Sequence, residues 1–177
     1  MKDRYGSLTI VLHWAMFLLF VAVYASMELR EIFPKGSDPR EAMKMWHFML
    51  GLSVLALAIV RLAGRLLETA PPITPAPPAW QTLITKLVHG ALYALMIAMP
   101  ILGWLILSAE AKPIPFFGLE LPALIGPDKE LAETIEELHE IGGTVGYYLI
   151  GLHAAAALFH HYIVRDNTLL RMLPRRG

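Results

Sequence analysis

Two histidines in the last apolar segment of the chain, His139 and His153, have a spacing that suits a helix-borne pair of ligands. They lie fourteen residues apart within residues 138–161. On an α-helix this is almost four turns, so both imidazoles face the same side about 21 Å apart. Glycines and alanines surround both positions and leave space for a flat, bulky group against the backbone. The pattern favours two stacked haems, one near each face of a bilayer.

The composition places the chain among membrane proteins. It has 177 residues, of which 56% are hydrophobic, with a mean hydropathy of +0.52. These values suit one membrane bundle better than a soluble domain. The net charge is zero, which argues against nucleic acid as a partner, because phosphate binding needs clustered Lys and Arg. The chain has no cysteine, which excludes disulfides, iron–sulfur clusters and covalently attached haem.

Four apolar runs predict an all-α membrane protein, a four-helix bundle formed by a single domain of residues 1–177. Each run is long enough to cross a hydrocarbon core of about 30 Å. The predicted spans cover residues 8–27, 45–67, 83–107 and 138–164.

The connections between the predicted spans differ in character. Residues 28–44 are polar and contain two prolines, so they predict a loop. Residues 69–78 hold five prolines and predict a stiff, extended crossing. In the third connection, the apolar patch 114–125 is too short and too interrupted to span, and we interpret it as an interfacial lid. The acidic residues 128–137 predict a helical turn or two before the last span.

The distribution of Lys and Arg predicts that both termini are cytoplasmic. The termini and the second connection carry nine of these residues, whereas the first and third connections carry six. Positive charge accumulates on the cytoplasmic side of membrane proteins. The nine are Lys2, Arg4, Arg61, Arg65, Lys86, Arg165, Arg171, Arg175 and Arg176.

This topology pairs the histidines by depth. His47 and His139 fall near the outer face, and His13 and His153 lie deeper, towards the inside. Two pairs of axial imidazoles would leave no open position on either iron, which favours electron transfer over binding of dioxygen. His160 lies seven residues after His153 on nearly the same face, so it could also partner His13, and spacing alone does not exclude this.

Other interpretations of the same residues stay open. A lone histidine on an apolar helix is often a hydrogen-bonded structural residue, although ionisable groups inside membranes usually have a function. The glycines are also typical of close helix packing, and the chain could be a bundle without haem. A single bare metal ion is excluded, since pairs about 21 Å apart cannot share an ion whose bonds are about 2 Å long.

Several stretches also resemble one family. They are LHW around His13, MKMWHFMLGLSVL around His47, the PPITP linker, and LHEIGGTVGYYLIGLHAAAALFHHYIVRDNTLLRMLPR near the C-terminus. Along essentially its whole length the chain resembles the bacterial dihaem cytochrome b-561 family, and most of all its superoxide oxidase branch.

The resemblance implies a four-helix bundle in the bacterial inner membrane with two haems b. It implies His13, His47, His139 and His153 as the axial ligands of the haem iron, which selects His153 over His160. In that branch, periplasmic superoxide gives an electron that passes through the haems to ubiquinone. The chain is therefore expected to be a superoxide:quinone oxidoreductase.

The charge pattern agrees better with electron transfer through two haems than with superoxide as the electron donor. Clefts of one sign attract ions of the opposite sign, but the outer connections hold twelve acids and six bases. A local funnel for superoxide would need the cations of these connections, and the alternative is that they are loop charges balanced by neighbours. The candidate residues are Arg30, Lys35, Lys44 and Lys112.

A quinone head group near the cytoplasmic interface would need hydrogen-bond donors beside the inner haem. Lysines and arginines at this depth also anchor lipid phosphates. The candidates are Ser7, Lys86, His89, His161 and Arg165. A second hypothesis for the whole chain is a membrane-anchoring cytochrome b subunit of a larger oxidoreductase, which would exchange electrons between the quinone pool and a partner redox protein.

Overall fold

The computed structural model describes residues 3–174 and is dominated by four long helices. All four are long and apolar enough to cross a membrane, which confirms the predicted all-α bundle. Lys2, Arg175 and Arg176 from the charge count lie outside the described residues. The helices are α1 (Ser7–Leu29), α2 (Asp38–Leu67), α3 (Ala79–Ala109) and α4 (Lys129–Phe159).

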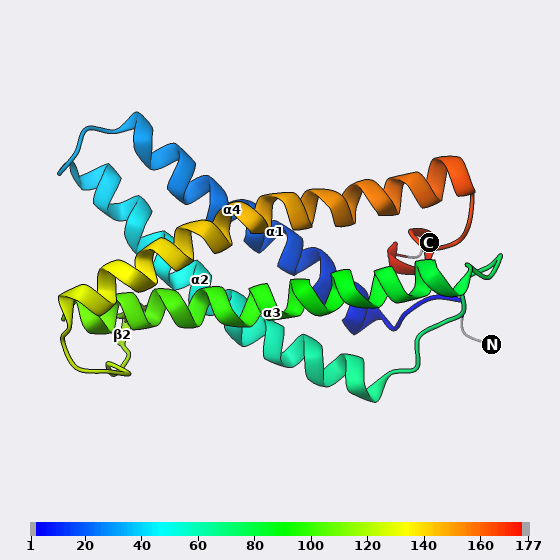
Figure 1. Cartoon of the computed structure of the whole chain (residues 1–177), viewed down its shortest axis with the longest axis horizontal. Helices are drawn as coiled ribbons and strands as arrows, with labels where there is room; N and C mark the ends of the chain where they lie inside the picture. Colours follow the sequence, from blue (N-terminus) through cyan, green and yellow to red (C-terminus); the bar gives the residue numbers. More distant parts are fainter. Residues whose placement is uncertain (1–2, 175–177) are drawn as a thin grey trace.

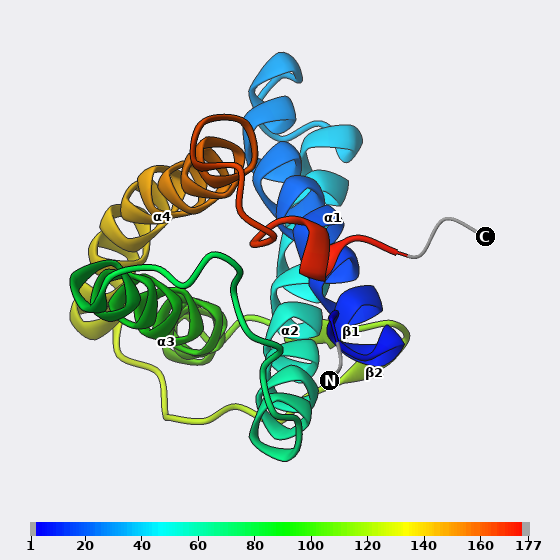
Figure 2. The same ribbon diagram turned by 90° about the vertical axis from the view of Figure 1, so that its right-hand side faces the viewer.

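The helices run alternately up and down the long axis of the molecule (Figure 1). The residues before α1, the linker 68–78 and the segment after α4 share one end, and residues 30–37 and 110–128 lie at the other. Helix α1 packs on α2, α3 packs on α4, and α2 joins the two pairs through α3. Viewed from the end, the α3–α4 pair lies beside the α1–α2 pair (Figure 2).

Helix α2 is longer than the sequence suggested. The prediction of a loop through residue 44 is wrong from Asp38 onwards, where α2 begins. Pro39 lies in the first helical turn, where its fixed φ and missing N–H are tolerated. The residues before Met45 are too polar to count as membrane span, yet they continue the helix beyond the apolar run. By contrast, the proline-rich linker 69–78 has no helix or strand, as predicted.

Helix α4 begins within the predicted acidic segment. The Asp128 side chain accepts a hydrogen bond from the Leu131 N–H at 3.0 Å and caps the helix. At the other end, a π-helical turn, η2 (His160–Val164), follows α4 and stops at Arg165, whose φ is 60°. The predicted helical entry over 128–137 is confirmed.

The interrupted apolar patch in the third connection folds into a short hairpin. Its strands are β1 (Pro115–Phe116) and β2 (Leu119–Glu120), paired antiparallel. Ile114 is buried beside Leu52 and Leu107, which attaches the hairpin to α2 and α3. The Trp104 Nε1–H donates to the Pro122 carbonyl at 3.0 Å. The segment therefore covers the end of the bundle that the charge count predicts to be the outer one.

The segment after α4 folds back over the opposite end of the bundle. Trp14 Nε1 on α1 donates to the Met172 carbonyl at 2.8 Å, beside the 3₁₀ turn η3 (Leu170–Met172). The Thr74 N–H donates to the Asn167 side chain at 2.9 Å, and the buried Arg171 guanidinium donates to the Pro71 carbonyl. The C-terminal segment thus fastens α1 to the proline-rich linker.

A glycine halfway between His139 and His153 admits a side chain from α1. Gly146 lies seven residues from each histidine, and a Cβ there would collide with the Tyr24 hydroxyl oxygen. This hydroxyl donates to the Gly143 carbonyl at 2.9 Å. Tyr24 therefore reaches the face of α4 that carries both histidines.

We predict that Gly146→Ala destabilises the protein. The added methyl group must displace the Tyr24 hydroxyl and break its hydrogen bond, at a cost of about 1 kcal/mol or more. The measurement is the thermal unfolding midpoint of the detergent-solubilised protein. Gly151→Ala is the matched control, since a Cβ at Gly151 meets nothing within 4 Å. Equal midpoints for the two variants would contradict the prediction.

Candidate functional site

The structure brings together two pairs of histidines at different levels of the bundle. The ring centroids of His47 on α2 and His139 on α4 are 6.1 Å apart, with the planes at 79°. Those of His13 on α1 and His153 on α4 are 6.2 Å apart, with the planes at 69°. Helix α4 supplies one member of each pair, and a different helix supplies the other.

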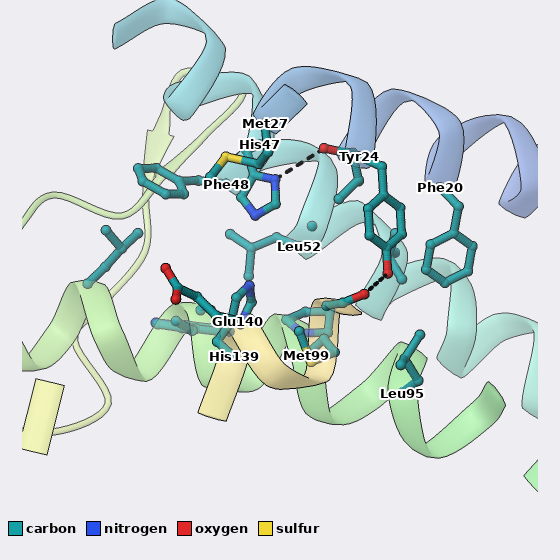
Figure 3. Close-up of a pocket in the computed structure, with 18 of the residues that line it drawn as sticks. Phe20, Tyr24, Met27, His47, Phe48, Leu52, Leu95, Met99, His139 and Glu140 are labelled. Carbon is teal, nitrogen blue, oxygen red and sulfur yellow. Dashed lines mark hydrogen bonds between the residues drawn. The ribbon is translucent and has the colours of Figure 1, made fainter. Parts of the chain in front are cut away.

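The outer pair opens into a cavity of about 410 Å³ between the two helix pairs (Figure 3). Its walls are mainly apolar, and two carboxylates, Glu28 and Glu140, also line it. A Cβ at Gly103 would lie 3.5 Å from the His139 ring, in ordinary van der Waals contact, so α3 passes close to this imidazole. Other lining residues are Phe20, Val23, Tyr24, Met27, Phe48, Leu52, Leu95 and Met99.

Backbone contacts orient His47. Its Nδ1 lies 3.3 Å from the Val23 carbonyl oxygen (dashed line in Figure 3). The Ser26 hydroxyl lies 3.5 Å from the same nitrogen. A carbonyl oxygen only accepts, so this contact favours the tautomer with the proton on Nδ1. Metal-binding histidines commonly donate one ring N–H in this way. The Nε2 lone pair of His47 then remains available to a metal.

The inner pair has a cation beside it. The Arg61 guanidinium on α2 donates to Nδ1 of His13, with a nitrogen–nitrogen distance of 2.8 Å. A third imidazole, that of His89 on α3, has its centroid 5.3 Å from that of His153. Of the five residues predicted to bind quinone, His89 is therefore the one whose ring lies against a proposed haem ligand, His153.

Two tyrosines lie between the levels of the two pairs. The ring centroids of Tyr24 and Tyr147 are 4.1 Å apart, and the Tyr147 hydroxyl donates to Glu28 at 2.8 Å. No role for Tyr24, Tyr147 or Glu28 was predicted from the sequence. The seven-residue spacing of Gly146 from each histidine was the available signal that a side chain could enter there.

Most of the outer cations proposed to attract superoxide have carboxylate partners. Arg30 pairs with Glu31 at 3.1 Å. Lys44 pairs with Glu41 at 2.9 Å, and Lys112 pairs with Glu110 at 2.8 Å. Lys35 is exposed and forms no ion pair within residues 3–174. Pairing reduces the field that each cation presents to an approaching anion.

The remaining quinone candidates lie around the inner end and do not converge on one point. Ser7, Lys86 and Arg165 are exposed, and the His161 ring contacts Tyr162 with centroids 4.8 Å apart. The adjacent His160 makes a stronger contact, because its Nδ1 lies 2.5 Å from Oδ2 of the buried Asp166.

The surroundings of the buried Asp166 favour the ionised form of its carboxyl group. Desolvation opposes ionisation of the carboxyl, but hydrogen bonds from His160 and the Thr168 backbone N–H outweigh it. The pKa of Asp166 therefore lies below its usual value. An anionic Asp166 accepts the Nδ1 proton of His160 and leaves Nε2 of that ring free.

Comparison with known proteins gives the family. Residues 4–175 match the family model described as prokaryotic cytochrome b561. The chain belongs to the prokaryotic cytochrome b561 family. It is 43% identical to cytochrome b561 homolog 1 of Escherichia coli (strain K12), over 98% of this chain and 99% of the relative. It is 38% identical to a probable superoxide oxidase, CybB, of Yersinia pestis, over 99% of each chain.

Membership in the cytochrome b561 family makes the chain a transmembrane electron-transfer protein of oxidoreductase type and implies b-type haem. Together with the four spanning helices, it points to a multi-pass protein of the bacterial inner membrane. These conclusions confirm the resemblance on which the expectations were based.

The two histidine pairs fit an axially ligated metal. Metal–imidazole bonds of about 2 Å would place the ring nitrogens about 4 Å apart and the centroids about 6 Å apart. The centroid distances of 6.1 Å and 6.2 Å agree with this geometry, whereas His89 and His153, at 5.3 Å, are closer. The cavity beside the outer pair has apolar walls, as expected for a site that holds a macrocycle.

We predict that histidine variants remove haem in pairs. His47→Ala and His139→Ala should each abolish the same haem, because each removes one axial ligand of one iron. His13→Ala and His153→Ala should each abolish the other. The measurement is the haem-to-protein ratio with the low-temperature absorption spectrum of the reduced protein, which separates inequivalent haems.

His89→Ala and His160→Ala serve as the matched controls and should keep both haems. Loss of a haem in His160→Ala, but not in His153→Ala, would show that the inner pairing is wrong.

Proposed function

We propose that this cytochrome oxidises periplasmic superoxide to dioxygen and passes the electrons through two haems b to ubiquinone, with both termini in the cytoplasm. Two superoxide anions release two electrons and become two dioxygen molecules. Ubiquinone takes up these two electrons and two protons to form ubiquinol. The reaction balances without any other reductant or oxidant.

The observation that carries this proposal is the placement of one histidine pair near each end of the bundle. Both pairs use α4, so the helical rise separates them by about 21 Å. Such a separation suits carriers that move electrons across most of a bilayer. The 38% identical relative of Yersinia pestis, named a probable superoxide oxidase, supports superoxide as the electron donor.

Haem b supplies a one-electron carrier at each pair, and the protein determines what surrounds it. At the outer pair, apolar side chains such as Leu52 and Met99 line the cavity and exclude water. The Val23 carbonyl orients His47. The four outer cations, Arg30, Lys35, Lys44 and Lys112, are the candidates for attracting superoxide, and three of them share their charge with a carboxylate.

At the inner end, quinone reduction needs a proton donor as well as electrons. The His160–Asp166 pair is suited to this task, since the buried carboxylate contacts Nδ1 and orients the imidazole as a positioned acid. His160 lies seven residues beyond His153, about 10 Å further towards the inner face. We place the quinone head group beside His160. Of the candidates, His161 is its neighbour in the same turn, and Ser7, Lys86, His89 and Arg165 lie around the same end of the bundle.

We expect superoxide to reduce the haems rapidly and ubiquinol to form afterwards. The measurement is rapid mixing of purified protein containing two haems with superoxide, with and without ubiquinone, while the haem bands and quinol are followed. Haem-free protein is the control. Haems that stay oxidised under superoxide, yet are reduced by quinol, would contradict superoxide as donor and favour the membrane-anchoring subunit.

The same measurement at several salt concentrations tests the outer cations. Because most of them are paired, we expect the second-order rate constant for haem reduction to change by less than about threefold between about 0.01 M and 0.15 M ionic strength. A steep fall with salt would instead reveal a strongly positive funnel around these residues.

We predict that His160→Gln and Asp166→Asn separate the two half-reactions. Haem reduction by superoxide should stay within about twofold, because the outer pair is unchanged. Quinol formation should slow by about tenfold or more, since positioned acids contribute at least this much. Tyr162→Phe is the control, because Tyr162 is exposed near the same turn. Unchanged quinol formation would limit the pair to a structural role.

A further inference from the structure

The charges around the two histidine pairs differ in sign. At the inner pair, the Arg61 guanidinium lies 2.8 Å from His13 and forms no ion pair within residues 3–174. Arg65 and Arg171 lie close enough to His89 to act on it electrostatically. Two carboxylates also lie at this end, Asp166 bonded to His160 and Glu68 bonded to Gly6 and Thr9, and the three guanidinium groups outnumber them. The inner pair therefore lies in a positive environment.

At the outer pair, carboxylates form part of the site. Glu28 and Glu140 both line the cavity that contains His47 and His139. The cation that acts electrostatically on His47 is Arg30, which is bonded to Glu31, and Glu31 also pairs with the buried Arg40 at 2.7 Å. The outer pair therefore lacks a free cation comparable to Arg61.

The contact between Arg61 and His13 cannot persist once His13 binds a metal as a neutral ligand. Arginine only donates hydrogen bonds, so Nδ1 of His13 is the acceptor and Nε2 carries the proton. Iron at Nδ1 would use the accepting lone pair, and iron at Nε2 would move the proton to Nδ1. In either case Arg61 would no longer donate to His13, and its permanent positive charge would remain on α2 beside the inner pair.

We propose that Arg61 and Glu28 order the reduction potentials of the two haems, with the inner haem the easier to reduce, so that electrons run inward. A cation beside a redox centre stabilises its reduced form, and a carboxylate stabilises its oxidised form. With haem bound at both pairs, one electron would pass from the outer iron, which would become ferric, to the inner iron, which would become ferrous. No proton or other atom would move in this step.

This inference rests on the proposed function and adds the order of the two potentials and the charges that set it. Arg61 and Glu28 are positioning residues that act through charge, without contacting superoxide or quinone in the proposed scheme. Their effect should therefore be visible in equilibrium potentials, which depend on neither the donor nor the acceptor.

The test is a spectroscopic redox titration of the purified two-haem protein. We expect the haem lost in His13→Ala to have the higher potential in the wild type. Its reduction equilibrium should be favoured at least tenfold over that of the outer haem, or about 59 mV for a one-electron couple. Equal potentials, or a higher outer potential, would overturn the inference while leaving haem binding and the two half-reactions intact.

Charge variants test the cause. Arg61→Gln should lower the inner equilibrium constant at least tenfold and change the outer one less than threefold. Glu28→Gln should raise the outer constant at least threefold. Arg61→Lys keeps the charge and should stay within threefold of the wild type. Glu133→Gln, at an exposed position on α4, is the control and should leave both potentials unchanged.

If Arg61→Gln does not retain the inner haem, Arg61→Lys and Glu28→Gln still decide the question. A Glu28→Gln variant with an unchanged outer potential would overturn the assigned role of Glu28. A large fall of the inner potential in Arg61→Lys would overturn the role of charge at Arg61. Failure of superoxide to reduce the haems would count against the proposed function alone.

Discussion

Imidazoles inside a hydrocarbon layer must find partners, and this constraint shapes the whole bundle. An isolated polar group there is costly, and four of the histidines lie in spanning helices at two levels. Helix α4 fixes both levels through its fourteen-residue spacing. Helices α1 and α2 run in opposite directions, so a histidine near the start of each reaches a different level. The two histidine levels therefore require the up-and-down order of the helices, which the short connections also favour.

The sequence predicted the parts of the fold that depend on long, strong patterns. Four apolar runs of sufficient length predicted the four helices, and the depth of each histidine predicted which residues approach one another. The start of α2 was not predicted, because Asp38 to Lys44 are polar and contain Pro39, a composition equally typical of a loop. Hydropathy identifies what the membrane covers, whereas this helix extends beyond the covered length.

The contacts that complete the candidate site depend on how each helix is rotated about its axis. In the sequence, Arg61 was only one of the nine cations in the charge count. The rotation of α2 directs its side chain at His13 on α1. Tyr24 reached Gly146 for the same reason, and the two residues are far apart in the sequence. Asp166 meets His160 because the chain leaves α4 through a π-helical turn. Periodicity gives the face of a helix but not the partner opposite it, so these residues emerged only from the structure.

The separation of the imidazoles within each pair also explains why the two layers of the bundle do not close. If α1 packed on α4 as tightly as it packs on α2, His13 and His153 would touch and leave no width for a metal ion between them. Instead α1 and α4 make little direct backbone contact. Tyr24 bridges them at mid-depth through its bond to Gly143, and the C-terminal segment holds the inner end of α1 through Trp14. These ties resist both collapse and separation of the layers. The geometry of each pair is thus held by contacts remote from the histidines, which lets the ring spacing stay near 6 Å at both levels.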